Sequence, residues 1–375
     1  MKLNYTATCL FGLEGFLGEE IEALGCRRID NMDGRITFEG DENTAAEASV
    51  NLRYAERLYL NLGSFEATTF TELFDGVKAI PWEDVIGCDD EFPVSGHSIK
   101  SKLFSVPDCQ RIIKKSVSVR LGEKYGLERL PETGKRYRIE FFLFKDKVNL
   151  MIDLSGVPLH KRGYRPETVD APIRETLAAA MVKISRPRED VLLWDPFCGS
   201  GTITIEAAMM MKNIAPGLQR SFAAEEYELF PADSWKNARE KAQANIKKDC
   251  SFEAYATDID PKCVEIAAAA AKRAGVQEML NIFAMDALDI DTLGRRGTIV
   301  TNPPYGERLL TVDEANDLYR AMGQAFSRLD KWQIYVITQS EIFPQLYGRR
   351  ADKIRKLYNG MIPCYYYQFF KQQNK

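Results

Sequence analysis

The feature that constrains this chain most is a strand pattern that runs directly into a glycine-rich turn and then a helix. Residues 191–195 form a largely apolar run, the turn occupies residues 196–202, and a helix pattern follows at once. Gly199 and Gly201 allow the backbone to bend tightly and to approach a ligand closely. Strand, turn and helix in this order predict an α/β sheet with a nucleotide-type site at its carboxyl edge.

The residues within the turn distinguish between a P-loop, a dinucleotide site and a site for a cationic ligand such as S-adenosylmethionine. A P-loop requires a lysine after its second glycine, and Thr202 follows Gly201 here. A dinucleotide fold favours a third small residue where Thr204 lies, and the acid at the strand end, Asp195, would repel a pyrophosphate. A carboxylate at Asp195 instead suits a cationic ligand, such as the amino-acid part of S-adenosylmethionine.

Three more predicted strands end in polar residues, namely residues 254–257 before Asp258, residues 281–285 before Asp286, and residues 298–300 shortly before Asn302. We expect Asp258 to accept hydrogen bonds from ribose hydroxyls and Asp286 to accept one from an adenine amine. A single acid at a strand end is more often a helix cap than a ligand contact. Four polar strand ends at one edge of a sheet nevertheless favour a ligand site.

The turn after the last of these strands consists of Asn302, Pro303, Pro304 and Tyr305. Two prolines remove two backbone donors, which leaves the carbonyls of Asn302 and Pro303 available to accept hydrogen bonds. Tyr305 adds a flat aromatic face beside them. Acceptors next to a stacking ring suit a planar amine, such as the exocyclic amine of a nucleobase, while an ordinary strand-ending turn is the alternative.

The N-terminal part of the chain alternates short strand and helix patterns. Over residues 3–63 their order is β-α-β-β-α-β, which predicts a ferredoxin-like plan. Next come a helix over residues 69–80, a strand near 92–94, a helix over 107–121, and strands over 136–144 and 148–154. After a short linker, a helix over residues 173–184 leads into the strand of the glycine-rich turn.

A basic stretch lies in the middle of this N-terminal part. It contains Lys100, Lys102, Arg111, Lys114, Lys115 and Arg120, and Asp108 is its only acid. The helix pattern over residues 107–121 directs these cations toward solvent. Because the net charge of the chain is −4, nucleic-acid binding must come from such a local patch. A merely solvated helix face is the alternative.

Composition excludes several classes of protein. Eight cysteines are dispersed without a C-x-x-C pair and are accompanied by two histidines, so no metal site is expected. No apolar run approaches the roughly 20 residues that span a bilayer, and the N-terminus lacks the charged and apolar regions of a signal peptide. We therefore expect a cytoplasmic protein with reduced thiols.

Several motifs resemble those of known families. Residues 51–57, 98–103 and 109–115 resemble a THUMP domain, which implies a fold that holds structured RNA. Residues 195–202, 257–260, 285–287 and 302–305 resemble the class I S-adenosylmethionine-dependent methyltransferases. With residues 160–165 and 302–308, the resemblance narrows to the THUMP-containing RNA guanine-N2 methyltransferases of the large-subunit ribosomal RNA type.

This resemblance implies an α/β fold with a seven-stranded Rossmann-like methyltransferase sheet, preceded by an α+β ferredoxin-like and THUMP region. Cofactor contacts are expected from Asp195, Cys198, Gly199, Gly201, Thr202, Asp258, Ile259, Asp286 and Ala287. RNA contacts are expected from Lys100, Lys102, Arg111, Lys114, Lys115, Arg162 and Arg165. For Arg162 and Arg165, the sequence does not decide between RNA and the cofactor.

The expected domain organisation follows the same motifs. We expect a ferredoxin-like N-terminal subdomain over residues 1–63, a THUMP RNA-binding domain over 64–156, a linker over 157–172 and a class I methyltransferase domain over 173–375.

The expected reaction follows from the Asn302 turn. An exocyclic amine that donates to the Asn302 side-chain oxygen and the Pro303 carbonyl would have its lone pair aimed at the methyl donor, while Tyr305 stacks on the base. Carbon methylation would require a nearby cysteine, and residues 264–363 contain none. We expect methylation of guanine N2 in ribosomal RNA. Guanine N2 in transfer RNA, adenine N6 in RNA or DNA, and a non-catalytic RNA-binding assembly factor are the alternatives.

Overall fold

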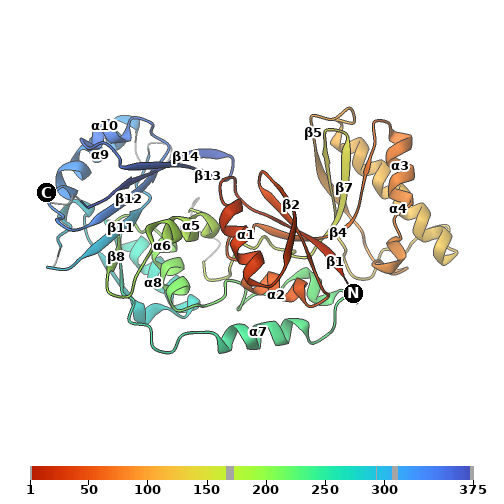
Figure 1. The fold of residues 1–375 in the computed structure, drawn as a ribbon, viewed down its shortest axis with the longest axis horizontal. Coiled ribbons are helices and arrows are strands. Elements are labelled where there is room, and N and C mark those ends of the chain that lie inside the picture. Colours follow the sequence, from red (N-terminus) through yellow and green to blue (C-terminus); the bar gives the residue numbers. More distant parts are fainter. Residues whose placement is uncertain (1, 166–172, 293, 306–310, 372–375) are drawn as a thin grey trace.

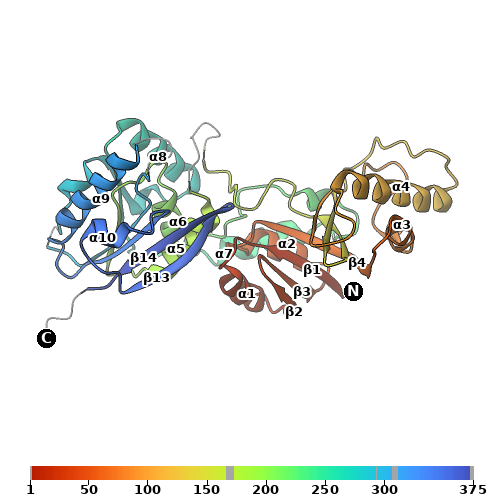
Figure 2. The same ribbon diagram turned by 90° about the horizontal axis from the view of Figure 1, so that it is seen from above.

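The computed structural model describes residues 2–165, 173–292, 294–305 and 311–371, which build two seven-stranded sheets. The two sheets lie at opposite ends of an elongated molecule (Figures 1 and 2). Among the described helices, none is both long and apolar enough to cross a membrane.

The first part of the N-terminal sheet has the predicted ferredoxin-like plan. Its elements are β1 (Leu3–Thr8), α1 (Glu14–Ala23), β2 (Arg27–Met32), β3 (Arg35–Gly40), α2 (Thr44–Asn51) and β4 (Arg57–Glu66). The strand order is β2-β3-β1-β4, and β1 pairs antiparallel with both β3 and β4. Tyr5, Phe38 and Leu58 fill the side of the sheet that α1 and α2 cover.

The second part extends the same sheet without a break. It comprises α3 (Phe70–Lys78), β5 (Val94–Ile99), α4 (Val106–Tyr125), β6 (Ile139–Phe144) and β7 (Lys147–Asp153). Strand β4 pairs with β7 along most of its length, so the seven strands run in the order β2-β3-β1-β4-β7-β6-β5. The expected boundary between residues 63 and 64 falls within β4, and the division into domains stays a prediction.

The C-terminal sheet has the predicted seven strands. They are β8 (Leu192–Asp195), β9 (Ala254–Asp258), β10 (Leu280–Ala284), β11 (Gly297–Thr301), β12 (Gln333–Thr338), β13 (Lys353–Asn359) and β14 (Ile362–Phe369). The order is β10-β9-β8-β11-β12-β14-β13, and only β14 runs antiparallel to its neighbours on both sides. The strand order therefore reverses at β8, beside the glycine-rich turn, which is where open α/β sheets bind ligands.

Helices cover both faces of this sheet. The elements are α5 (Glu175–Ser185), α6 (Thr202–Met211), α8 (Pro261–Ala274), α9 (Val312–Phe326) and α10 (Phe343–Tyr347). Alternate residues of β8 enter opposite cores, because Leu193 joins the cluster that includes α5 and α6 whereas Trp194 joins Tyr319 and Phe343 from α9 and α10. The sequence patterns did not predict α10, which is only five residues long.

A long insertion after α6 ties the two halves together. Its helix α7 (Ser234–Ala244) packs on α2. Ser234 Oγ lies 2.8 Å from Asn43 Oδ1, and Lys241 Nζ lies 2.9 Å from Glu47 Oε1. In Figure 1, α7 lies below α1 and α2. These contacts join the insertion from the C-terminal half to α2 of the N-terminal half.

Candidate active site

The four polar strand ends meet at the carboxyl edge of the C-terminal sheet. Asp195 and Asp258 are the last residues of β8 and β9, Asn302 directly follows β11, and Asp286 follows β10 after one residue. The first three of these strands, β8, β9 and β11, are adjacent and parallel. Residues that are up to 107 positions apart in the sequence therefore share one edge of the fold.

Asp195 is a buried carboxylate linked to β11. The residue is only 1% exposed. Its Oδ1 accepts hydrogen bonds from Thr301 Oγ1 at 2.6 Å and from the Phe197 amide at 3.2 Å. Burial raises the pKa of Asp195 to about 7, against an ordinary value of 3.8. Sequence reasoning missed Thr301, although a polar residue at the end of an apolar strand and directly before Asn302 was a usable signal.

The glycine-rich turn is held against the neighbouring strand by Asp258. Gly199 and Gly201 have φ values of 51° and 74°, in the left-handed region that favours glycine. The Gly199 amide donates to Asp258 Oδ2 at 2.9 Å, and the Cys198 amide donates to the Thr257 carbonyl at 2.9 Å. A Cβ atom on Gly201 would lie only 3.0 Å from the Ala267 Cβ, so the turn also packs closely on α8.

The remaining residues expected to contact the cofactor differ in their exposure. Cys198, Thr202 and Ala287 are buried, whereas Ile259 beside Asp258 is 72% exposed, which is unusual for a large apolar side chain. Asp286 Oδ1 accepts a hydrogen bond from the Leu288 amide at 2.9 Å and so caps a short helical turn. That bond uses one lone pair of Asp286 and leaves the others available.

The Asn302 turn presents free acceptors. The Asn302 side chain is half-buried. No described residue forms a hydrogen bond with its side-chain amide or with the Pro303 carbonyl oxygen. Tyr319 Oη donates to the Pro304 carbonyl at 3.1 Å and also lies 2.9 Å from Thr338 Oγ1, which anchors the turn on α9 and β12. No specific signal in the sequence pointed to Tyr319. The following residues of the expected motif, 306–308, lie outside the described residues.

The structure corrects the expectation that Arg162 contacts RNA. Its side chain is 1% exposed, and its Nε lies 2.7 Å from Oε1 of Glu206, whose side chain is fully buried. Glu206 also accepts from Arg53 Nη1 at 3.2 Å and from Tyr164 Oη at 2.9 Å. A guanidinium enclosed in this way cannot reach an RNA phosphate. Its role is to join the N-terminal half to α6.

Arg165 lies beside the glycine-rich turn. Its Nη2 pairs with Glu175 Oε2 at 2.7 Å, and its Nη1 lies 3.4 Å from Thr202 Oγ1. The Thr202 hydroxyl is also 3.1 Å from Ser200 Oγ. Arg165 is thus placed on the candidate cofactor side rather than on an open surface.

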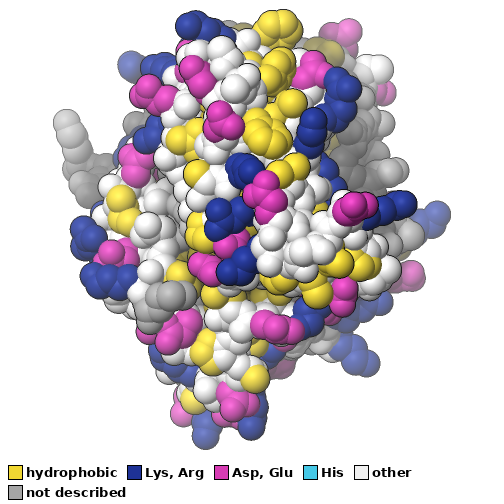
Figure 3. All heavy atoms as spheres, turned by 90° about the vertical axis from the view of Figure 1, so that its right-hand side faces the viewer, with side chains coloured by type: hydrophobic (Ala, Val, Ile, Leu, Met, Phe, Trp, Pro, Cys, Tyr) yellow, Lys and Arg dark blue, Asp and Glu magenta, His cyan; other side chains and the backbone are white. Residues whose placement is uncertain are grey.

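The basic stretch around α4 is less basic in the folded chain than in the sequence. Arg111 pairs with Asp108, and Lys114 pairs with Glu132 while its Nζ lies 3.5 Å from the centre of the Phe92 ring. Figure 3 looks onto this end of the molecule and shows acidic and basic side chains interspersed. Of the expected RNA contacts here, three exposed lysines have no ion pair with any described residue: Lys100, Lys102 and Lys115.

Comparison with known families agrees with this architecture. The sequence profile described as "RMKL-like, methyltransferase domain" matches residues 162–368, the "RlmL ferredoxin-like domain" profile matches residues 4–59, and the THUMP domain profile matches residues 67–153. The chain belongs to the RMKL-like methyltransferase family. The predicted resemblance, including the THUMP region, is therefore confirmed.

Two relatives of this RMKL-like methyltransferase extend the comparison. YpsC of Bacillus subtilis (strain 168), described as a candidate RNA methyltransferase, is 43% identical over 374 residues, which are 99% of this chain and 97% of YpsC. The ribosomal RNA large subunit methyltransferase K/L of Psychromonas ingrahamii is 33% identical over 96% of this chain. The chain spans 49% of the length of that second relative.

Solved structures resemble the RMKL-like methyltransferase over its full length. A structure described as a possible methylase of Clostridium difficile 630 has a TM-score of 0.96 and 42% identity, with 100% of both chains covered. A protein described as a candidate methyltransferase, in complex with SAH, has a TM-score of 0.93 and 39% identity, covering 100% of this chain and 99% of its own. A protein of Listeria monocytogenes described as a predicted N6-adenine-specific DNA methylase has a TM-score of 0.93 and 42% identity, covering 99% of this chain and 97% of its own.

Proposed function

We propose that this chain methylates the exocyclic amine of an RNA base, namely guanine N2 in large-subunit ribosomal RNA. The observation that carries the proposal is the Asn302 turn, whose side-chain amide and Pro303 carbonyl have no described partner at the ligand-binding edge of the sheet. The THUMP region and the relatives that are named as RNA methyltransferases support RNA as the substrate class.

The residues at this edge fit S-adenosylmethionine, which supplies an electrophilic methyl group when bound. The buried carboxylate of Asp195 suits the α-ammonium group of the cofactor's amino-acid part, because an opposite charge offsets its desolvation. Asp258 retains lone pairs for ribose hydroxyls, and the exposed Ile259 offers an apolar surface for the adenine. The related structure that contains SAH supports the same assignment.

The chain's own residues orient the acceptor base. Asn302 Oδ1 and the Pro303 carbonyl accept the two N–H bonds of the amine, which directs the nitrogen lone pair and stabilises developing positive charge. Tyr305 stacks on the extruded base, whose removal from its stack costs about a few kcal/mol. Tyr319 and Thr338 keep the turn in place through the Pro304 carbonyl.

Adenine N6 is the second candidate acceptor. The same pair of acceptors at Asn302 and Pro303 would hold its amine equally well, because both amines are planar and carry two N–H bonds. The similarity to the Listeria protein described as a predicted N6-adenine-specific DNA methylase favours this alternative. The guanine assignment rests on the large-subunit ribosomal RNA relative.

Substitution of Asn302 by alanine tests the proposal. Asn302→Ala is expected to lower the rate of methyl transfer to RNA by about 10²–10³-fold while the affinity for S-adenosylmethionine is unchanged, because one oriented acceptor is lost. Asn359→Ala, at the far end of β13, is the matched control. Full activity of Asn302→Ala would refute the role of the turn.

Nucleoside mass spectrometry of the methylated RNA identifies the acceptor. N2-methylguanosine supports the proposal, and N6-methyladenosine supports the second candidate. If the wild-type protein binds both RNA and S-adenosylmethionine but transfers no methyl group to any RNA, the chain is a non-catalytic assembly factor instead.

A further inference from the structure

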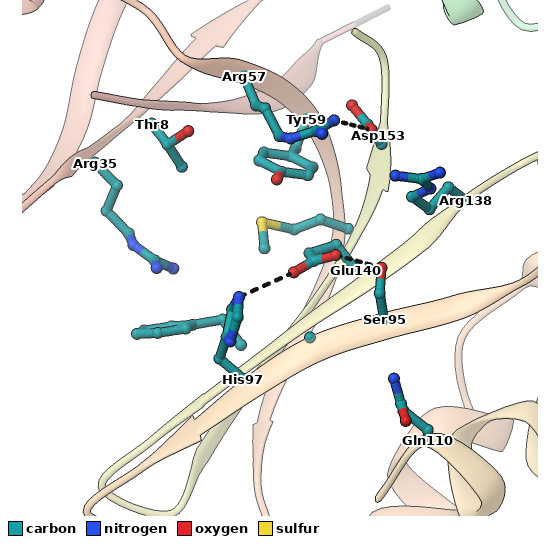
Figure 4. Close-up of a pocket in the computed structure, with 13 residues that line it drawn as sticks. Thr8, Arg35, Arg57, Tyr59, Ser95, His97, Gln110, Arg138, Glu140 and Asp153 are labelled. Atoms are coloured by element: carbon teal, nitrogen blue, oxygen red, sulfur yellow. Dashed lines mark hydrogen bonds and ion pairs between the residues drawn. The ribbon is translucent and has the colours of Figure 1, made fainter. Parts of the chain in front are cut away.

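A cavity of about 480 Å³ lies on the N-terminal sheet, away from the candidate active site. Ten of its lining residues are labelled in Figure 4. They come from β1, β3, β4, β5, β6, β7 and the first half of α4, except Arg138, which directly precedes β6. The volume is in the range of small-molecule pockets. No part of the proposed methyl transfer uses this cavity.

Strand register explains why these side chains converge. Thr8 pairs with both Arg35 and Arg57, Tyr59 pairs with Asp153, and Glu140 pairs with both Met151 and Ser95. Directly paired residues point to the same side of a sheet. The residues between them, such as Leu58 and Phe141, are buried in the core beneath the helices. The cavity therefore lies on the sheet face opposite α1 and α2.

An apolar cluster forms the floor of the cavity. Tyr59, Phe142 and Met151 pack together there, with Phe144 against them. The Arg35 guanidinium lies 3.4 Å from the centre of the Phe142 ring, so a planar cation covers the aromatic surface. Burial lowers the pKa of Arg35, and within the described residues no carboxylate pairs with it. Tyr59, Phe142 and Met151 are each less than 10% exposed, so this small cluster is covered by the surrounding side chains except where it lines the cavity.

Polar groups surround this floor. Arg57 Nη1 pairs with Asp153 Oδ2 at 2.6 Å, and Glu140 Oε2 accepts a hydrogen bond from Ser95 Oγ at 2.6 Å. Arg138 has no hydrogen bond or ion pair from its side chain to any other described residue. In Figure 4, Arg35 and Arg138 stand on opposite sides of Tyr59 and Glu140. The cavity thus offers stacking planes, unpaired guanidinium groups and a carboxylate at short range.

We propose that this cavity binds one unpaired nucleotide of the RNA substrate. The proposal rests on RNA being the substrate, as proposed above. Tyr59 and the Arg35 guanidinium provide planes for the base, because unstacked bases stack on aromatic rings and on arginine. Arg138 binds a flanking phosphate, and Glu140 accepts a hydrogen bond from a base amine or a 2′-hydroxyl.

The shape and chemistry of the cavity favour this ligand over a duplex or a free anion. A double helix is contacted through its phosphates on an exposed surface, and a recess with an apolar floor does not match it. A phosphate alone would not use Tyr59, Phe142 and Met151. A nucleotide uses both the apolar floor and the unpaired arginines, as in single-strand binding proteins.

Binding of a short fluorescein-labelled single-stranded RNA by the full chain tests the proposal. Arg35→Gln and Arg138→Gln are each expected to weaken binding at least about fivefold and to reduce the slope of log K against log salt by about 0.7. Arg27→Gln on β2, outside the cavity, is the matched control and is expected to change affinity less than about twofold. Unchanged binding by both cavity variants, or no binding by the wild-type protein, would overturn the proposal.

Two further measurements locate the base. Replacing the nucleotides by abasic ones is expected to weaken binding by at least about fivefold, and equal binding of the abasic strand would overturn the base contact. Photocrosslinking of a 4-thiouridine RNA to the wild-type protein is expected to label the peptides that contain Tyr59 or Phe142. Crosslinks that avoid both peptides would likewise overturn it, and this test does not depend on how a variant folds.

These outcomes are separable from failure of the proposed function. Calorimetry with S-adenosylmethionine and nucleoside analysis of methylated RNA report on the active site alone. If methyl transfer to RNA is present and the cavity variants bind like the wild type, only the cavity proposal fails. If the cavity variants weaken RNA binding and no methyl transfer occurs, only the proposed function fails.

Discussion

The buried carboxylate of Asp195 leads to a prediction about stability. Replacing it by asparagine keeps the side-chain shape and an Oδ1 that can still accept from Thr301 and Phe197. The charge that burial disfavours is removed. Asp195→Asn is therefore expected to stabilise the protein at neutral and alkaline pH while it weakens binding of a cationic ligand.

The magnitude and pH dependence follow from the pKa of Asp195. The folded-state pKa of about 7 lies above the ordinary value of 3.8, so protonated Asp195 contributes stability that is fully present below about pH 4 and is lost as the pH rises to about 7. The folded-state and ordinary pKa values differ by about three. At about 1.4 kcal/mol for each unit of pKa, this corresponds to about 4 kcal/mol in the free energy of unfolding. The gain from asparagine is thus expected to grow from acid pH to about pH 7 and to stay constant above it.

Urea unfolding at about pH 5 and about pH 8 measures this effect. The transition of the C-terminal half can be followed by tryptophan fluorescence, because Trp194 and Trp332 are buried in its core. Asp286→Asn, at a half-exposed strand end of the same edge, is the matched control and is expected to change stability by less than about 0.5 kcal/mol. A gain of less than about 1 kcal/mol for Asp195→Asn at about pH 8 would refute the reasoning.

Three other predictions concern different parts of the molecule. Glu206→Ala is expected to lower the free energy of unfolding by about 3–5 kcal/mol, because it removes the buried carboxylate that pairs with both Arg53 and Arg162; a loss of about 1 kcal/mol or less in urea would contradict this. Asp258→Ala is expected to weaken S-adenosylmethionine binding at least about tenfold in calorimetry, and unchanged affinity would argue against the ribose assignment. Lys115→Glu is expected to weaken RNA binding and to reduce its salt slope by about 1, so an unaltered slope would remove α4 from the interface.

Much of the fold could be predicted because its signals are local. The strand that ends at Asp195, the glycines that adopt left-handed backbone and the helix that begins at Thr202 are encoded within about 20 consecutive residues. The terminal hairpin of β13 and β14 is likewise local, because its two strands follow each other directly in the chain. Helix α10 was not, because five residues are too few to establish a helical period.

The sequence indicated which residues form the candidate site, but not which distant residues form hydrogen bonds with them. Strand ends that carry polar residues mark the edge, so Asp195 and Asn302 stood out in the sequence. The bond from Thr301 to Asp195 and the anchoring of Pro304 by Tyr319 both need partners that are distant in the chain. No periodicity indicates which distant hydroxyl will face a given carboxylate.

The sequence by itself determined the order of strands and helices, the glycine-rich turn and the polar strand ends, since each depends on neighbouring residues only. The tertiary structure alone decided which charged side chains have no ion-pair partner and remain accessible. It enclosed Arg162 with Glu206, neutralised Lys114 with Glu132, and gathered Arg35 and Arg138 around one cavity. The physical reason is that ion pairing and burial depend on distances in space, which the register of distant strands sets and the spacing of residues along the chain does not.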